Sequence, residues 1–238
     1  MLEAVGVARR FGWRWALKGV DLAVSRGRPL ALLGPNGSGK STLLKTLAGL
    51  LRPTRGEVRL DGQPLAAWGR GRVGLVGHEP LLYPSLTVRE NLRFFGKIHG
   101  LPRARREERL GELAEALGLD GRLDEPVRAL SQGLRQRAAL ARALLHDPEL
   151  VLMDEPFSGL DPEAADRLEG MVRALCAEGR GRIVVFATHD VARARSLARE
   201  GILLAEGRVA LRAPAEDLAA GAFARALREA PAGEGRAG

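Results

Sequence analysis

The segment Gly34-Pro35-Asn36-Gly37-Ser38-Gly39-Lys40-Ser41 decides how the rest of the chain is interpreted. It matches the eight-position phosphate-binding loop, with its glycines and its lysine and serine at set places. The glycines let backbone N–H groups converge on an anion, and the following helix adds the positive end of its dipole. We expect Lys40 to contact the β- and γ-phosphates of a nucleotide, and Ser41 and Thr42 to complete the loop, with the Ser41 hydroxyl toward Mg²⁺.

The order of apolar runs and amphipathic segments predicts an α/β fold. A short apolar run ends at Gly34, which places the loop between a buried strand and a helix, so an accidental glycine-rich turn is disfavoured. A capping-box pattern at Thr87 and Glu90 opens a helical stretch in the middle of the chain, and Asp161-Pro162-Glu163 is a strong helix start. The expected strands are 17–24, 28–33, 58–60, 73–76, 150–153, 183–187, 202–204 and 208–211, and the expected helices are 41–50, 87–95, 103–117 and 132–145.

A second motif is the apolar run Leu150-Val151-Leu152-Met153 followed by Asp154 and Glu155. Parallel strands of such a sheet end at the edge where nucleotides bind, so both carboxylates are expected there. Asp154 is a candidate Mg²⁺ ligand, and Glu155 is the candidate that polarises water for attack on the γ-phosphate. A pair of solvated acids at a strand end is the alternative, and the phosphate loop makes it less favoured.

A third motif, Leu130-Ser131-Gln132-Gly133-Leu134-Arg135-Gln136-Arg137, opens the helix that precedes the acidic strand. With this segment the chain resembles the ATP-binding-cassette (ABC) ATPases, whose usual signature is LSGGQ. Ser131 and Gly133 are kept, whereas Gln132 replaces a glycine and Leu134 replaces the glutamine. The resemblance implies a P-loop NTPase fold: a RecA-like core sheet, an N-terminal antiparallel β subdomain and a helical subdomain inserted at about 79–148. It also implies that Ser131, Gln132 and Gly133 meet the γ-phosphate held by a second subunit; a simple helix cap at Ser131 is the other interpretation.

Further matches extend the resemblance over residues 1–212 as one domain, with 213–238 expected to be a short helix and a flexible tail. Ser158-Gly159-Leu160-Asp161 matches the segment that crosses the family's dimer interface, so Asp161 is a candidate nucleotide-binding residue. His189 matches the switch histidine that contacts the γ-phosphate, and with Lys40 and Glu155 it completes the catalytic candidates. Phe11 lies where the family stacks an aromatic ring on adenine, and Trp13 is close enough to compete.

His78 stands where the family normally has a glutamine. The dipeptide Gly77-His78 and the residues after it resemble the ATPase of cytochrome c maturation, the haem-exporter subgroup. The Ser-Gln-Gly-Leu form of the signature is instead similar to drug, antibiotic and polysaccharide exporters. His78 as a surface histidine without a role is a third interpretation.

The composition and charge exclude several kinds of site and partner. The chain has 238 residues, one cysteine and a net charge of +8, so disulfide frameworks and thiolate metal clusters are excluded. The positive charge is spread along the chain, and its densest cluster, between Arg103 and Arg109, alternates with glutamates as a solvated helix face does. We therefore expect no nucleic-acid partner. There is no apolar run long enough to span a bilayer and no secretory signal, which predicts a cytoplasmic location.

The resemblance implies an ATPase that uses ATP and Mg²⁺ and powers export through a separate membrane subunit, on the inner face of the membrane. Two copies would sandwich two ATP molecules, and the segment from Tyr83 to Gly100, next to His78, would contact the membrane subunit. The cargo is either haem for cytochrome c maturation or a drug, antibiotic or polysaccharide. A non-transport ATPase acting on DNA or ribosomes is less favoured, because the chain carries one cassette and no heptad insertion. A regulatory module with inactive chemistry is a further alternative.

Overall fold

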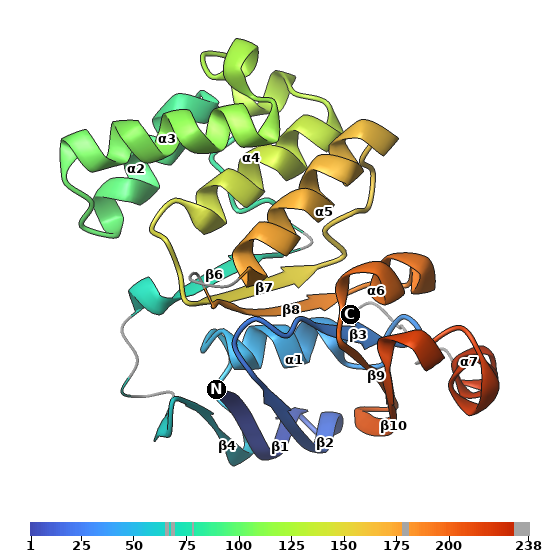
Figure 1. Cartoon of the computed structure of the whole chain (residues 1–238). Helices are drawn as coiled ribbons and strands as arrows, with labels where there is room; N and C mark the ends of the chain where they lie inside the picture. Colours follow the sequence, from blue (N-terminus) through green and yellow to red (C-terminus); the bar gives the residue numbers. More distant parts are fainter. Residues whose placement is uncertain (65–66, 68–69, 78, 178–180, 231–238) are drawn as a thin grey trace.

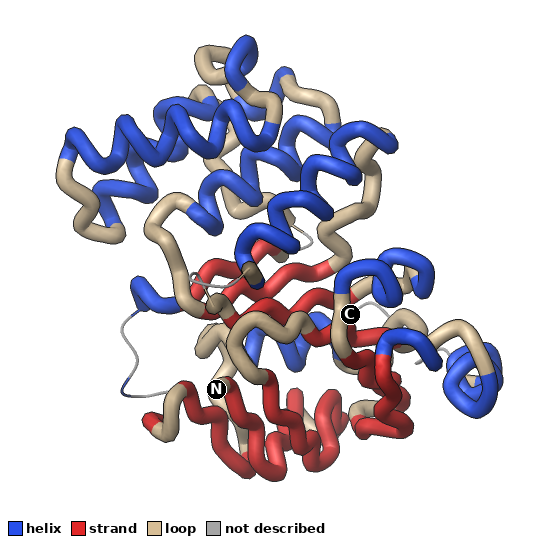
Figure 2. Tube along the Cα trace, viewed as in Figure 1, coloured by secondary structure: helices blue, strands red, loops and turns tan. Residues whose placement is uncertain are grey.

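The structure is a computed structural model that describes all residues except 65–66, 68–69, 78, 178–180 and 231–238. Two β-sheets and a layer of helices make up the chain (Figure 1). One sheet has the strand order β10-β9-β3-β8-β7-β6, and the other has the order β2-β1-β4-β5. Helix α1, Lys40–Leu47, lies between the two sheets, and the other large helices cover the far face of the six-stranded sheet (Figures 1 and 2). The expected α/β fold is therefore confirmed.

The six-stranded sheet carries the expected parallel strands. Its members are β3 (Leu30–Leu33), β6 (Val73–Val76), β7 (Leu150–Asp154), β8 (Ile183–Ala187), β9 (Glu200–Ala205) and β10 (Arg208–Pro214). β6, β7, β8, β3 and β9 run parallel to one another, and β10 closes the edge as an antiparallel hairpin with β9. Every residue of β3, β7 and β8 is buried, because one apolar core lies on each face of the sheet.

The antiparallel sheet is built from β1 (Leu2–Phe11), β2 (Arg14–Val24), β4 (Arg55–Leu60) and β5 (Gln63–Pro64). Strand β1 was not expected, because its buried residues do not alternate regularly. Its pairing with β2 shifts register between Ala4 and Val7, between Val7 and Ala8, and between Arg9 and Arg10, and such bulges break the period of two. Strands β2 and β4 also begin three residues before the expected positions. Their first residues, Arg14 and Trp15 in β2 and Arg55 and Gly56 in β4, do not continue the apolar pattern from which the strands were predicted.

Three helices follow β6 and precede β7. These are α2 (Val88–Ile98), α3 (Arg103–Leu117) and α4 (Gln132–Leu144). The capping box is present: Thr87 Oγ1 accepts from Glu90 N at 3.1 Å, and Thr87 N donates to Glu90 Oε2 at 2.8 Å. On α3, Arg105 pairs with Glu108 at 2.7 Å, as expected for a solvated face, whereas the side chains of Arg106 and Arg109 are only 16% and 12% exposed.

The remaining elements complete the sheet connections. Asp161 caps helix α5 (Pro162–Cys176), its side chain accepting from Ala164 N, and Asp190 caps α6 (Val191–Leu197) in the same way. Helix α1 ends three residues before the expected end, because Gly49 turns the chain with a φ of 76°. A short helix, α7 (Gly221–Glu229), follows β10, and the expected flexible tail 231–238 lies outside the described residues. None of the described helices is long and apolar enough to pass through a bilayer.

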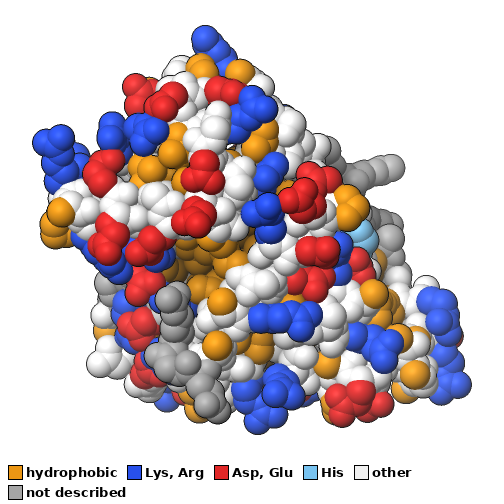
Figure 3. All heavy atoms as spheres, turned by 45° about the horizontal axis from the view of Figure 1, so that its top comes forward, with side chains coloured by type: hydrophobic (Ala, Val, Ile, Leu, Met, Phe, Trp, Pro, Cys, Tyr) orange, Lys and Arg blue, Asp and Glu red, His pale blue; other side chains and the backbone are white. Residues whose placement is uncertain are grey.

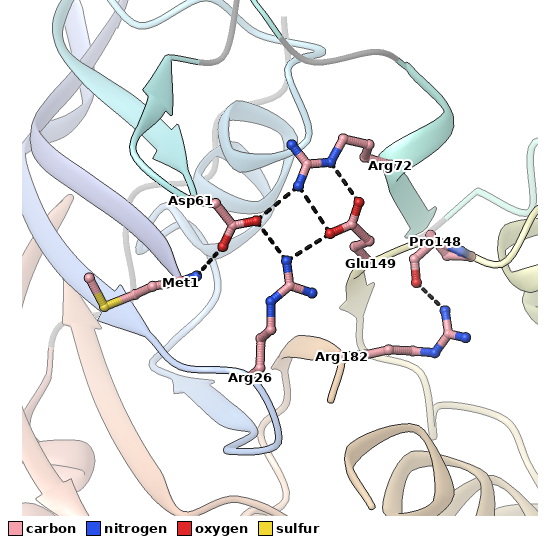
Figure 4. A network of polar contacts seen from close by, with 7 residues as sticks. All are labelled: Met1, Arg26, Asp61, Arg72, Pro148, Glu149 and Arg182. Carbon is pink, nitrogen blue, oxygen red and sulfur yellow. Dashed lines mark hydrogen bonds and ion pairs between the residues drawn. The ribbon is translucent and has the colours of Figure 1, made fainter. Parts of the chain in front are cut away.

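A ring of charges fixes the antiparallel sheet to the six-stranded sheet (Figure 4). Arg26 bridges Asp61 at 2.6 Å and Glu149 at 2.7 Å, and Arg72 contacts the same two carboxylates. These arginines hold the pKa of Asp61 and of Glu149 at about 2; at Asp61 the chain's amino group contributes most. Asp61 follows β4, whereas Arg72 and Glu149 precede β6 and β7, so the ring joins the two sheets at the edge opposite the strand ends that carry Asp154 and Thr188.

Candidate functional site

The phosphate loop has the backbone that the sequence predicted. Gly34 and Gly39 have φ values of 143° and 109°. A Cβ at Gly34 would lie 2.2 Å from Leu204 O, and a Cβ at Gly39 would lie 2.8 Å from Ala16 O. Glycine is therefore required at both positions by conformation and by space.

Lys40 is buried at the start of α1. Its Nζ donates to Gly34 O at 2.7 Å and to Pro35 O at 3.1 Å, so the ammonium lies inside the loop. Burial lowers the pKa of Lys40, while Glu155 and Asp154 oppose this shift. The lysine is thus a buried cation beside the two acids of β7, where it can act on a phosphate.

Glu155 follows β7 in a left-handed conformation with a φ of 49°. Its N–H donates to Ala187 O at 3.0 Å, which continues the ladder between β7 and β8. A glutamate in this region of φ and ψ is strained, and strain of this kind is concentrated at functional sites. No local pattern predicts this conformation, because the proline that follows favours extended backbone at the residue before it.

His189 lies at the end of β8 and meets Glu155. Its Nδ1 is 2.9 Å from Glu155 Oε2, while 79% of its side chain is exposed. The neighbouring Thr188 N donates to Leu32 O at 3.0 Å, which ties this turn to β3 beside the phosphate loop. The expected switch histidine and the expected water-polarising carboxylate are therefore direct partners.

One cavity of about 950 Å³ brings most of the predicted residues together. This volume is large enough for a nucleotide. The predicted residues that line it are Phe11, Asn36, Gly37, Gly39, Lys40, Ser41, Thr42, Asp154, Glu155 and His189. Phe11 is 46% exposed and lines the cavity, whereas Trp13 is 85% exposed and is not among its lining residues.

The sequence did not predict part of the cavity lining. Glu206 and Gly207, in the turn between β9 and β10, lie beside the phosphate loop, since Gly207 N donates to Ser38 O at 3.0 Å. The other lining residues that were missed are Arg14, Trp15, Ala16 and Lys18, and Ser158, which was expected only in the interface segment, also lines the cavity. A hairpin turn about 170 positions from the loop gives no local signal of this contact.

The signature residues form a separate group. Ser131 caps α4, its Oγ accepting from Leu134 N at 3.3 Å, and Asp161 caps α5. An added Cβ at Gly133 would lie 3.3 Å from Gly159 O, so the signature packs against the segment before α5. Ser131, Gln132, Gly133 and Asp161 are not among the residues that line the nucleotide cavity.

Four other predicted residues are not among the residues that line this cavity. Pro35 and Gly34 contribute carbonyl oxygens to Lys40. Ser38 is buried, and within the described part of the chain its Oγ has no hydrogen-bond partner. His78 lies outside the described residues.

Oxygen ligands for a magnesium ion are present in the cavity. The Ser41 hydroxyl and the Asp154 carboxylate line the same space, and Asp154 is buried at the end of β7. Mg²⁺ prefers oxygen ligands of these kinds and keeps the rest of its shell from water and phosphate. The donor set therefore fits the ion that the sequence predicted.

A phosphate loop on a parallel sheet, with an acidic strand end beside it, defines a P-loop nucleoside triphosphatase. The ABC transporter family matches residues 17–158, and the chain belongs to this family.

Curated relatives agree with this assignment. The chain is 39% identical over 211 residues to the "Nod factor export ATP-binding protein I" of Ralstonia nicotianae, covering 87% of this chain and 65% of that protein. It is 34% identical over 192 residues to the "Linearmycin resistance ATP-binding protein LnrL" of Bacillus subtilis, covering 79% of this chain and 61% of that protein. The chain thus spans slightly less than two thirds of the length of these two relatives.

Solved structures match over nearly their whole length. The dimeric structure of MJ0796, a bacterial ABC transporter cassette, superposes with a TM-score of 0.84 at 29% identity, covering 90% of this chain and 99% of that chain. A post-hydrolysis dimer of the same cassette, bound to ADP and Pi, gives a TM-score of 0.83. The family match and these cassettes identify the chain as an ATP-binding and ATP-hydrolysing cassette.

Proposed function

We propose that this chain powers export through a separate membrane subunit, as a cytoplasmic protein bound to the inner face of the membrane. The observation that carries the proposal is the cavity in which Lys40, Glu155 and His189 meet, in a chain whose relatives are named for Nod factor export and linearmycin resistance. A catalytic cavity of this kind favours an active ATPase over a regulatory module.

We assign roles in hydrolysis from the position of each group in the cavity. Water attacks the γ-phosphorus in line with the leaving oxygen, the P–O bond to ADP breaks, and ADP and inorganic phosphate are released. Glu155 orients the water and accepts its proton, and His189 holds the Glu155 carboxylate in place and reaches the γ-phosphate. Lys40 stabilises charge on the phosphates. Ser41 and Asp154 would hold Mg²⁺, which supplies further positive charge at the phosphate oxygens.

The second half of each site is proposed to come from another copy of the chain. Ser131 and the first N–H groups of α4 form an anion site that is absent from the cavity of the same chain. In a dimer with ATP between the subunits, this site would meet the γ-phosphate bound by the partner. Gln132, Gly133 and Asp161 lie in the two segments that would face that interface.

The contact with the membrane subunit is proposed at α2 and the loop before it. Tyr83 and Phe94 are exposed and stack edge to face with centroids 5.1 Å apart, and Ile98 is 62% exposed. An apolar aromatic surface of this kind is characteristic of a protein interface. This segment follows β6, which pairs with β7, the strand that ends at Asp154, so contact there can reach the nucleotide cavity through β6 and β7.

The proposed cargo belongs to one of two classes. Relatives named for Nod factor export and linearmycin resistance favour the drug, antibiotic or polysaccharide type. The Gly77-His78 dipeptide is the support for haem export, and no described contact of His78 bears on it.

Co-expression with polytopic membrane proteins encoded beside the gene tests the proposal. We expect the chain to co-purify with one such protein, and ATP-dependent transport by the complex in vesicles to separate haem from amphiphilic or glycan cargo. The Glu155→Gln variant controls for transport that does not depend on hydrolysis. Co-purification with ribosomes or DNA in place of a membrane protein would reject the proposal.

A further inference from the structure

Gln136 is a buried polar side chain on the helix that the signature residues open. Figure 3 shows charged side chains of both signs on the surface of the helical layer. Gln136 lies in α4 but is only 9% exposed, and a buried amide needs a hydrogen-bond partner. Its Nε2 donates to Pro156 O in a long hydrogen bond of 3.5 Å. The partner of this buried amide is therefore the backbone of the residue directly after Glu155.

Glu155 has a strained backbone that requires support from its surroundings. Its φ of 49° is left-handed, and such a conformation persists in a glutamate only where several contacts fix it. Glu155 N donates to Ala187 O at 3.0 Å, and Glu155 O accepts from Ser158 N at 3.1 Å. These two bonds join Glu155 to the sheet and to its own turn. Gln136 fixes the next carbonyl group from the helical layer, which is a third and separate direction.

The first turn of α4 packs closely on the segment 156–160, which follows Glu155. An added Cβ at Gly133 would lie 3.3 Å from Gly159 O, and an added Cβ at Gly159 would lie 3.0 Å from Cδ and Nε2 of Gln132. Phe157 of the same segment packs edge to face on Phe186 of β8, with ring centroids 6.4 Å apart. The position of the segment is therefore set jointly by α4 and by the sheet.

We propose that Gln136 is a positioning residue for Glu155 of its own chain. Gln136 holds the carbonyl group that follows Glu155, so that the strained backbone keeps the carboxylate in the nucleotide cavity beside His189. Gln136 does not line that cavity and touches no nucleotide itself. Helix α4 would thus act on two ATP molecules, through Ser131 on the partner's and through Gln136 on its own chain's. This inference rests on the proposed role of Glu155 in hydrolysis.

Gln136→Met removes the amide and keeps a side chain of similar length in the core. We expect kcat for ATP to fall about five- to tenfold, the factor that corresponds to one lost hydrogen bond. The Kd for ATP should stay within about twofold, because Gln136 does not line the cavity. Leu140→Met is the matched control: it also places a methionine at a buried position of α4 and should keep the wild-type kcat. If Gln136→Met does not bind ATP, Gln136→Leu removes the same amide and should give the same fall.

A double variant separates positioning of Glu155 from a general structural role. When Gln136→Met is added to Glu155→Gln, the residual single-turnover rate should change by less than about twofold, because the carboxylate that Gln136 positions is gone. An equal fall in both backgrounds, or a wild-type kcat in Gln136→Met, overturns the inference. A Glu155→Gln protein that hydrolyses ATP at the wild-type rate would instead reject the role of Glu155 on which the inference rests.

Mixed dimers test whether Gln136 acts within its own chain. Ser131→Arg blocks the α4 terminus and Lys40→Ala disables the nucleotide cavity, so a dimer of the two chains keeps one composite site, whose cavity belongs to the Ser131→Arg chain. Gln136→Met in that chain should lower kcat about five- to tenfold, and in the Lys40→Ala chain it should leave kcat unchanged. The reverse result, or an equal fall in both placements, overturns action within one chain. Mixed dimers without any activity would reject the proposed two-chain site, and the comparison of the two Glu155 backgrounds would then decide the inference.

Discussion

Helices α1 and α4 both begin within a motif that contains glycine, but the residues that cap them differ. At α1 the residue before the helix is Gly39, which has no side chain to accept from the first N–H groups. At α4 the Ser131 hydroxyl already accepts from Leu134 N. Only the α1 terminus shares a cavity with Lys40 and the acids of β7. The α1 terminus is thus a complete anion site within one chain, whereas the α4 terminus needs an anion that another molecule brings.

Among the substitutions that test this comparison, removal of the Glu155 carboxylate should have the largest effect on ATP hydrolysis. Glu155→Gln keeps the shape but cannot accept a proton, so we expect kcat for ATP to fall by about 10³-fold, within the range for loss of a general base or transition-state group. ATP should stay bound, and the α4 terminus of the second chain should close on it. Size-exclusion chromatography with Mg-ATP should then show a dimer.

His189→Ala is the companion variant, because it removes the 2.9 Å contact and leaves the carboxylate. We expect a smaller fall in kcat than for Glu155→Gln. A Glu155→Gln protein that hydrolyses ATP at the wild-type rate and stays monomeric would contradict both the role of Glu155 and the two-chain site.

Ser131→Arg tests the α4 terminus directly. The arginine should block the partner's γ-phosphate, so hydrolysis should fall by about 10²-fold, while ATP binding by the isolated chain stays unchanged because Ser131 does not line its own cavity. Fluorescent-nucleotide binding and phosphate release measure the two effects separately.

Mixing Ser131→Arg with Lys40→Ala provides the control. A mixed dimer keeps one intact composite site, so activity should return to a fraction of wild type that depends on the mixing ratio. No recovery in demonstrated mixed dimers would show that each chain hydrolyses ATP without the partner's α4 terminus.

The contact between the C-terminal end of α4 and β6 should respond to pH through His146. Its Nε2 lies 3.1 Å from Val73 O of β6, and its ring stacks on His99 with centroids 3.8 Å apart. Burial, with a contribution from His99, lowers the pKa of His146 to about 4. The imidazole is therefore neutral in the fold and takes up a proton in the unfolded chain as pH falls below about 6.5.

The free energy of unfolding should accordingly decrease as pH falls from about 6.5 toward 4. Between pH 7 and 5 the loss should be about 1–2 kcal/mol, because the unfolded chain binds the proton first. Urea unfolding of wild type and His146→Phe measures it: the phenylalanine keeps a ring on His99 and removes the titrating group. We expect a shallower pH dependence in the variant, with the remainder due to His99, whose pKa burial also lowers. Identical slopes would show that His146 does not titrate in this way.

The sequence predicted those residues of the nucleotide cavity that belong to short contiguous motifs. The phosphate loop, the acids after β7 and His189 after β8 follow from strand ends that meet at one edge of a parallel sheet. The wall at Glu206 and Gly207 could not be predicted, because a contact between the last hairpin and the phosphate loop depends on the packing of β9 against β3. The bulged strand β1 was missed for a related reason, since its hydrophobic period is broken by register shifts.

Phe11 and Trp13 give the prediction with the smallest expected effect. From the sequence either ring could stack on adenine, and in the structure only Phe11 is among the residues that line the nucleotide cavity. Loss of a base-stacking ring costs about 1–3 kcal/mol, and since Phe11 is half exposed we expect Phe11→Ala to weaken ATP binding by about tenfold, near the lower end of that range. Trp13→Ala should leave the Kd for ATP within about twofold, because its ring lies in solvent. Inorganic tripolyphosphate has no base, so its Kd should be the same for wild type and both variants. If Phe11→Ala weakened tripolyphosphate as much as ATP, the ring would support the fold of the loop and would not bind the base; if Trp13→Ala gave the larger loss for ATP, the assignment of the two rings would be reversed.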